Sequence, residues 1–386
     1  MSNSTLSYRN DLQGLRALAV IAVLFFHIWP DSYRGGFIGV DVFFVISGFL
    51  ITSLLILEAE KKQRIDLANF WSRRMRRLLP AATLVLLISL FLAFFYMPES
   101  DWLNTAKQVF ASSLYFQNWM LVAQSVDYMA REASATVVQH YWSLSIEEQF
   151  YIAWPLFIAL AAAISRSTKR RVRNVALVFS IVLLISSFCI SAFVYLGAPH
   201  GYFTSTTRVW ELSLGATLAL LWPYIQWKNV TRVILSWMGF ILVVLSIFVI
   251  KQDQNFPGYI ALLPTVGAIL LILGNQVRGA AGTLLGYQPL RYIGDISYAV
   301  YLWHWPLVVL AKQAPEIQQL PSWQQSGGII VATLTLSVLT KYLVEDPFRH
   351  GFLAFGLRSQ KRTLFVTSSI VSAVVLVATS SSIALF

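Results

Sequence analysis

The chain has 386 residues, of which 57% are hydrophobic and only 12% are charged, and its formal net charge is +11. A soluble domain carries about twice this charged fraction, so the composition excludes a soluble globular protein and indicates a polytopic membrane protein. The positive balance follows from the enrichment of Lys and Arg in cytoplasmic loops, and we therefore expect no nucleic-acid partner.

Apolar stretches near the length of a bilayer span recur along the whole chain and predict an all-α bundle of about 10–11 transmembrane helices. The stretches cover residues 12–30, 37–57, 78–97, 145–164, 175–196, 208–223, 233–250, 258–275, 294–311, 326–344 and 364–386. Three of them (12–30, 208–223 and 294–311) are short and carry polar groups, which is typical of interior helices. Segment 98–144 contains an amphipathic stretch, which we expect to lie on the outer surface or to re-enter the protein.

Basic residues gather in alternating loops. The loop 58–80 carries seven Lys and Arg, and the loop 165–174 carries five. Because such loops stay in the cytoplasm, the N-terminus is predicted to be cytoplasmic, and an odd number of spans places the C-terminus outside.

Arg16 and His27 are two ionisable residues in the first apolar stretch. Eleven helical steps of about 100° bring both side chains to one face, roughly 16 Å apart along the axis, so that His27 is near mid-bilayer if Arg16 is at a surface. A neutral imidazole takes a proton from a hydroxyl near pH 7, as acyl transfer requires, and a guanidinium binds an anionic donor. The alternatives are a structural His bonded to another helix and an Arg that reaches the inner surface.

A dense basic cluster precedes the third stretch and consists of Arg73, Arg74, Arg76 and Arg77. Two pairs, 73/76 and 74/77, have helical i,i+3 spacing. Guanidinium groups suit phosphates such as the pyrophosphate of coenzyme A. The alternative is an anchor that fixes topology.

Four other ionisable residues are candidates for the acceptor side or for support of the site: Asp41, Glu147, Glu148 and His304. The two adjacent glutamates are expected at an outer mouth, where one of them orients or activates an acceptor hydroxyl or pairs with a buried Arg. Asp41 begins the second span from the outer side, and the nearby Gly48 favours a kink or a close helix approach. His304 is either a second site residue or a satisfied core histidine.

Two other patterns are set aside. Arg208 and Glu211 have i,i+3 spacing and predict a structural salt bridge. The lone Cys189 excludes a disulfide framework, and without zinc-type spacing or an HExxH motif we expect no metal site.

Six blocks resemble the acyltransferase 3 family in order and spacing over residues 8–350: YRNDLQGLRALAV…FFH, GVDVFFVISGFLIT, RRMRRLLP, YWSLSIEEQFY, ISYAVYLWHWPL and VEDPFR. This family consists of membrane O-acyltransferases, including bacterial O-antigen and other surface-polysaccharide acetylases. Its activity-linked Arg, ten residues, His motif matches Arg16 and His27. Its R-x-x-R motif, associated with the acyl donor, falls on Arg74 and Arg77 or equally well on Arg73 and Arg76.

The resemblance implies a multi-pass O-acetyltransferase of the bacterial inner membrane. It implies acetyl-CoA from the cytoplasm as donor and a hydroxyl of a periplasmic glycan such as lipopolysaccharide O-antigen as acceptor. His27 is then a general base or a transient acyl carrier. A lipid or small-molecule acceptor and a non-catalytic transporter or permease stay as alternatives, although the chain lacks the repeated halves of many transporters.

The resemblance also divides the chain. Residues 1–350 are expected to form the membrane acyltransferase 3 domain, and residues 351–386 a cytoplasmic connector and an eleventh transmembrane helix. Many members of the family that modify surface glycans continue from there into a periplasmic SGNH-type domain. The chain is therefore either a stand-alone form or a shortened version, and such a domain is a candidate partner beside membrane lipids, glycan and coenzyme A thioester.

Overall fold

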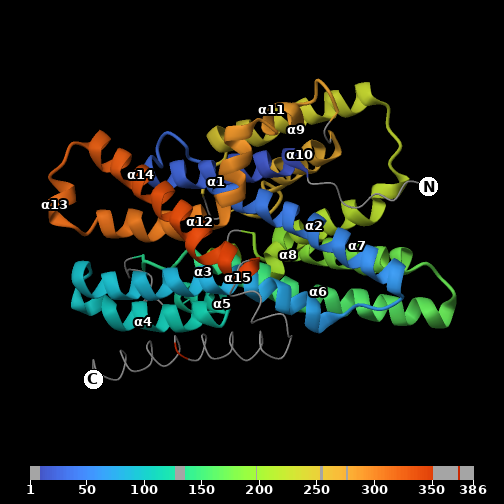
Figure 1. Ribbon diagram of the computed structural model, residues 1–386, viewed down its shortest axis with the longest axis horizontal. Helices are drawn as coiled ribbons and strands as arrows, with labels where there is room; N and C mark the ends of the chain where they lie inside the picture. The colour runs from blue at the N-terminus through green and yellow to red at the C-terminus, as the bar shows by residue number, and fades with distance from the viewer. Residues whose placement is uncertain are drawn as a thin grey trace. The chain divides into compact units, whose positions relative to one another are not determined.

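The computed structural model describes residues 9–126, 135–196, 198–252, 255–274 and 277–350, together with Ala373 (Figure 1). All regular secondary structure in these ranges is helical, which confirms the all-α prediction. Apart from Ala373, the predicted connector and eleventh span at 351–386 lie outside the described residues.

Each of the first ten predicted spans coincides with a helix. These helices are α1 (Asn10–Ile28), α2 (Gly39–Lys62), α3 (Leu67–Tyr96), α6 (Tyr141–Thr168), α7 (Val172–Cys189), α8 (Ser205–Leu221), α9 (Asn229–Val249), α10 (Leu262–Gly274), α12 (Gln288–Ala311) and α14 (Ser322–Thr340). The shorter helices are α4 (Glu99–Ser113), α5 (Gln117–Val126), α11 (Ala281–Leu285), α13 (Pro315–Gln318) and α15 (Asp346–Arg349). Single turns of 3-10 or π-helix occupy Gly36–Ile38, Ile190–Val194, Pro199–Tyr202, Trp222–Tyr224 and Lys341–Glu345.

Seven helices in the described ranges are long and apolar enough to cross a membrane, so the chain is a multi-pass membrane protein. The seven are α1, α2, α3, α6, α7, α9 and α14. Among the other predicted spans, α8 and α10 have only 17 and 13 residues. Helix α12 has 24 residues, but its apolar pattern is interrupted by polar groups such as Asp295 and His304.

The chain divides into two compact units. Unit 1 comprises Met1–Ile65, Phe157–Tyr202 and Thr206–Ser297, and unit 2 comprises Asp66–Leu156, Phe203–Ser205 and Tyr298–Phe386. Two of the boundaries fall within α6 and α12, so each of these helices contributes to both units.

In unit 1, two glycines let helices approach through their backbones. A Cβ added to Gly48 on α2 would lie 1.8 Å from the Leu212 carbonyl oxygen, and one added to Gly215 on α8 would lie 2.0 Å from the Val45 oxygen. Only glycine permits this contact, which is the close helix approach predicted at Gly48. Helices α9 and α10 of the same unit lie side by side (Figure 1).

In unit 2, α3 and α6 run antiparallel. The Trp71 indole nitrogen donates to the Tyr151 carbonyl at 3.0 Å, and the Tyr141 hydroxyl donates to the Ala82 carbonyl at 2.8 Å. Residue numbers therefore rise along α3 as they fall along α6. This pairing sets the level of every side chain on one helix against the other.

The amphipathic segment forms α4 and α5, and several of its polar side chains are buried in unit 2. The Gln117 side-chain amide donates to Gln108 Oε1 at 2.9 Å, and the Thr136 hydroxyl donates to the same oxygen at 2.6 Å. All three residues are almost fully buried. Both placements predicted for segment 98–144 stay predictions, because each of them buries one face of the segment against the protein.

Candidate functional site

The arginine cluster belongs to α3 itself. The helix begins at Leu67, eleven residues before the predicted start at 78, because Asp66 caps it by accepting a hydrogen bond from the Asn69 backbone nitrogen at 3.0 Å. Arginine is a good helix former, so the charged run continues the helix rather than preceding it. Arg73 is exposed, whereas the other three arginines of the cluster are half-buried.

Arg74 faces α6. Its guanidinium carbon lies 4.7 Å from the centroid of the Tyr151 ring and 5.9 Å from that of Phe70. The Tyr151 hydroxyl donates to Glu147 Oε1, and Arg74 and Glu147 both interact electrostatically with Glu148. We call these four residues (Arg74, Glu147, Glu148 and Tyr151) the α3–α6 cluster.

The α3–α6 cluster corrects one expectation from the sequence. The arginines were expected on the inner side and the two glutamates at an outer mouth, yet Arg74 and both glutamates lie together. The reason is the register of the helices: α6 begins at Tyr141, which is level with Ala82 of α3, and the glutamates lie two turns further along, towards Arg74. An arginine and two half-buried carboxyl groups therefore share one place in unit 2.

His304 lies in unit 2 beside a second histidine. It is fully buried, and its Nδ1 lies 2.6 Å from the Tyr301 carbonyl oxygen. Because a carbonyl only accepts, Nδ1 carries the proton. The His140 ring lies 5.6 Å from the His304 ring, between centroids, and the Tyr301 hydroxyl donates to the His140 carbonyl at 3.1 Å. The Nδ1 atom of His304 is thus satisfied, and both predicted alternatives, a second site residue and a core histidine, stay predictions.

Arg16 and His27 belong to unit 1, on α1. The helix begins at Asn10 and ends at Ile28, so His27 lies in its last turn and Arg16 in its second. Arg16 donates to Gln13 Oε1 at 3.1 Å, and the His27 ring packs edge-on against Phe26 at 4.9 Å. Both side chains are half-buried. Arg16 is therefore about 9 Å from the helix start, and His27 is close to the helix end.

Asp41 takes part in a buried charge triad in unit 1. Arg208 Nη1 lies 3.3 Å from Asp41 Oδ1 and 3.2 Å from Glu211 Oε1, and all three side chains are fully buried. The second distance confirms the predicted i,i+3 salt bridge. Three aromatic rings surround the guanidinium, those of Phe44, Tyr202 and Phe256, with centroids 5.5–5.6 Å from its carbon. Asp41 thus contacts a structural cation.

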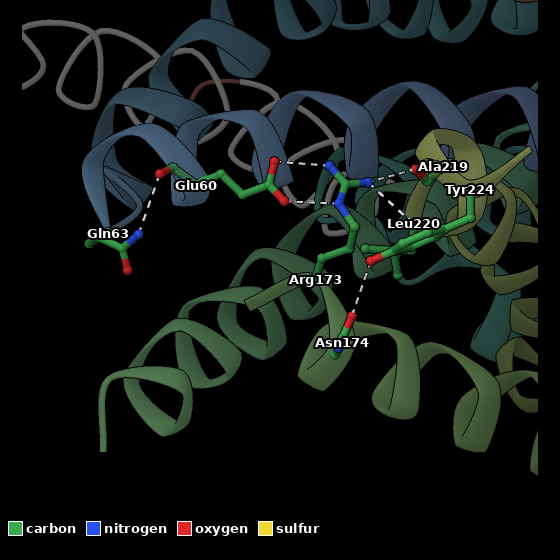
Figure 2. A network of polar contacts seen from close by, with 7 residues as sticks. All are labelled: Glu60, Gln63, Arg173, Asn174, Ala219, Leu220 and Tyr224. Atoms are coloured by element: carbon green, nitrogen blue, oxygen red, sulfur yellow. Dashed lines mark hydrogen bonds and ion pairs between the residues drawn. The ribbon is translucent and has the colours of Figure 1, made fainter. Parts of the chain in front are cut away.

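Arg173 of unit 1 caps the C-terminal end of α8 (Figure 2). Arg173 forms a two-pronged ion pair with Glu60 at 2.8 and 2.9 Å, and its third nitrogen donates to the Ala219 and Leu220 carbonyls at 3.2 and 3.3 Å. These carbonyls belong to the last turn of the helix and lack partners within it. Arg173 therefore joins α7, α2 and α8, and its basic loop does more than set topology.

Sequence reasoning missed His140, Tyr151 and Arg173. A signal existed for Tyr151, because it follows Glu147 by four residues and the two side chains share one helix face. None of the three contacts across helices follows from spacing alone. Among the described residues no group of three or more His, Cys, Asp or Glu side chains is placed to hold a metal ion.

Comparisons with known proteins agree with the resemblance to membrane acyltransferases. The profile of a family described as an acyltransferase domain matches residues 9–342. YrhL of Bacillus subtilis (strain 168) is 34% identical over 365 residues, which are 91% of this chain and 56% of that protein. The O-acetyltransferase OatA of Staphylococcus aureus (strain MRSA252) is 32% identical over 377 residues, 94% of this chain and 61% of that protein.

The peptidoglycan O-acetyltransferase OatA of Listeria monocytogenes serovar 1/2a is 31% identical over 374 residues, 93% of this chain and 59% of that protein. The chain thus spans about three fifths of the length of the curated relatives it matches. No solved structure matches it.

Proposed function

The chain belongs to this family of acyltransferase domains, and on that premise we propose that it is a membrane O-acetyltransferase of a cell-surface glycan. The observation that supports the proposal beyond family membership is the α3–α6 cluster. Its arginine suits the phosphates of a donor, and its adjacent carboxyl groups suit the hydroxyl of an acceptor. We propose residues 1–350 as the acyltransferase domain, with a cytoplasmic N-terminus, and residues 351–386 as connector and eleventh span.

The donor in this proposal is acetyl-CoA, held by its pyrophosphate on Arg74 and Arg77. Two observations favour this pair over Arg73 and Arg76. Arg73 is exposed, and the Arg74 guanidinium lies over the Tyr151 ring. A guanidinium stacked by its face keeps the N–H groups of its edge directed outward, where phosphate oxygens accept them.

With His27 as general base, the acceptor hydroxyl attacks the thioester carbonyl, a C–O bond forms, the C–S bond breaks, and the hydroxyl proton passes through His27 to coenzyme A, which leaves as the thiol. With His27 as acyl carrier, its imidazole first displaces coenzyme A from the acetyl group, and the acceptor hydroxyl then attacks the acyl-imidazole and releases the imidazole. Glu148 and Glu147 orient the hydroxyl. The family motif assigns activity to Arg16 and His27, with His27 either accepting the hydroxyl proton or carrying the acetyl group. We propose Asp41, which is paired with Arg208, and His304, which is bonded to the Tyr301 carbonyl, as supporting residues rather than contacts of the acceptor.

The acceptor we propose is peptidoglycan, and the location is a bacterial plasma membrane. The support is the name of the Listeria relative, which replaces the initial expectation of lipopolysaccharide O-antigen. Because the relatives are longer than this chain, we also propose that a further domain of SGNH type assists transfer to the glycan in the whole protein.

The test uses the chain in lipid vesicles with radiolabelled acetyl-CoA and peptidoglycan fragments. We expect acetyl transfer and release of free coenzyme A. His27→Ala should lower the rate of acetyl transfer about 10²–10⁴-fold, while insertion into the membrane is unchanged. Arg74→Ala with Arg77→Ala should weaken coenzyme A binding, whereas Arg73→Ala, on the exposed side of α3, should not.

Three results would contradict the proposal. Robust transfer by His27→Ala removes that residue from the chemistry. Unchanged coenzyme A affinity in the Arg74/Arg77 variant reduces the cluster to an anchor. Transport of a solute without release of coenzyme A identifies a permease.

A further inference from the structure

Tyr151 is the residue that joins the arginine and the carboxylate of the α3–α6 cluster. It is only 4% exposed. Its ring lies beneath the Arg74 guanidinium at 4.7 Å, and its hydroxyl donates to Glu147 Oε1. Its backbone carbonyl accepts from the Trp71 indole at 3.0 Å, which fixes this turn of α6 against α3.

The ring has a physical consequence for Arg74. A half-buried arginine side chain loses conformational entropy about several rotatable bonds when it binds a ligand, and this loss weakens binding. Stacking on the Tyr151 face removes part of that freedom before the ligand arrives and leaves the guanidinium edge for bidentate contacts. A phosphate ligand then meets an arginine that is already oriented.

The hydroxyl has a different consequence, for the two glutamates. Tyr151 follows Glu147 by one helical turn, so its hydroxyl holds one oxygen of that carboxylate. Glu148 points about 100° away on the helix and interacts electrostatically with Arg74 instead. Tyr151 therefore holds the Glu147 carboxylate in one orientation on the face of α6 that also carries the ring beneath Arg74.

We propose that Tyr151 is a positioning residue of the transfer reaction, with its ring ordering Arg74 for the donor phosphates and its hydroxyl ordering Glu147 for the acceptor. The inference rests on the proposed function. It assigns the Tyr151 ring to the donor and the Tyr151 hydroxyl to the acceptor. It follows that the two effects separate when the hydroxyl and the ring are removed one at a time.

Tyr151→Phe keeps the ring and removes the hydroxyl. We expect the kcat for acetyl transfer to fall about tenfold, as for loss of a hydrogen bond to a charged group, with unchanged binding of coenzyme A. Tyr151→Leu removes the ring as well, and the Kd for coenzyme A should also rise about three- to tenfold. Binding is measured by titration calorimetry with coenzyme A in nanodiscs, and kcat with radiolabelled acetyl-CoA.

Tyr141→Phe is the matched control. It lies on the same helix, faces the same neighbour, and also loses one buried hydroxyl hydrogen bond, here to the Ala82 carbonyl. It should lower thermal stability about as much as Tyr151→Phe while changing neither kcat nor coenzyme A affinity. A merely structural role for Tyr151 predicts that the two variants behave alike.

The outcomes separate this inference from the proposed function. If the wild-type chain transfers acetyl groups and Tyr151→Phe has the kcat of Tyr141→Phe, the role of the hydroxyl is overturned. If folded Tyr151→Leu binds coenzyme A as tightly as wild type, the role of the ring is overturned. If the wild-type chain binds coenzyme A and transfers nothing, the proposed function fails, and the comparison of binding still decides the role of the ring.

Discussion

Replacement of Arg208 by methionine isolates the buried charge triad of unit 1. Arg208 Nη1 lies within 3.3 Å of carboxyl oxygens of both Asp41 and Glu211, and all three side chains are fully buried. Methionine keeps a long, unbranched apolar chain and removes the charge. Two carboxyl groups then lie in an apolar interior without a cation, and breaking a buried ion pair in this way costs about 3–5 kcal/mol.

Variants of the two acidic partners are controls, and each of them should lose less stability than Arg208→Met. The triad holds two carboxyl groups for one guanidinium, so Asp41→Asn or Glu211→Gln leaves one ion pair in place. Each change should cost about 1 kcal/mol, the contribution of one hydrogen bond. The triple variant Arg208→Met/Asp41→Asn/Glu211→Gln removes every charge and should recover most of the loss, because neutral groups of similar volume replace buried ion pairs with little cost.

The assay is thermal unfolding of purified protein in detergent, followed by tryptophan fluorescence. We expect the highest midpoints for wild type and the two single acid variants, a lower one for the triple variant and the lowest for Arg208→Met. The reasoning is refuted if Arg208→Met unfolds at the temperature of Asp41→Asn, or if the triple variant is no more stable than Arg208→Met.

The helices were accessible from the sequence because their signal is local. Apolar stretches near the bilayer thickness report helices directly, and the i,i+3 pair of Arg208 and Glu211 lies within one helix. The start of α3 was placed late because hydropathy falls at the arginines, although the capping residue Asp66 was visible in the sequence. Hydropathy locates the apolar part of a helix and misses a charged extension of it.

The sequence identified single residues of the candidate site, but it could not predict which of them lie together. Asp41 and Arg208 are 167 positions apart, and nothing in either segment reports that they meet. The pairing of Arg74 with Glu147 and Glu148 depends on the register between α3 and α6, which the bond from Tyr141 to Ala82 reveals and spacing does not. Tertiary register, rather than residue type, determines which charges meet.

Two further changes test packing and capping in unit 1, and Gly327→Ala on α14 of unit 2 is the control for the first. Gly48→Ala places a methyl group 1.8 Å from the Leu212 carbonyl oxygen, so α2 and α8 must separate, and we expect a loss of about 1–3 kcal/mol in thermal unfolding. Gly327→Ala, where nothing lies within 4 Å, should instead stabilise its helix by up to about 1 kcal/mol. Arg173→Lys keeps the charge but loses the two-pronged bond to Glu60 together with a donor to the end of α8, which should cost about 1 kcal/mol. A lysine variant as stable as wild type would show that charge alone, and not the guanidinium fork, holds these helices, and a Gly48→Ala variant as stable as Gly327→Ala would show that the helices do not touch.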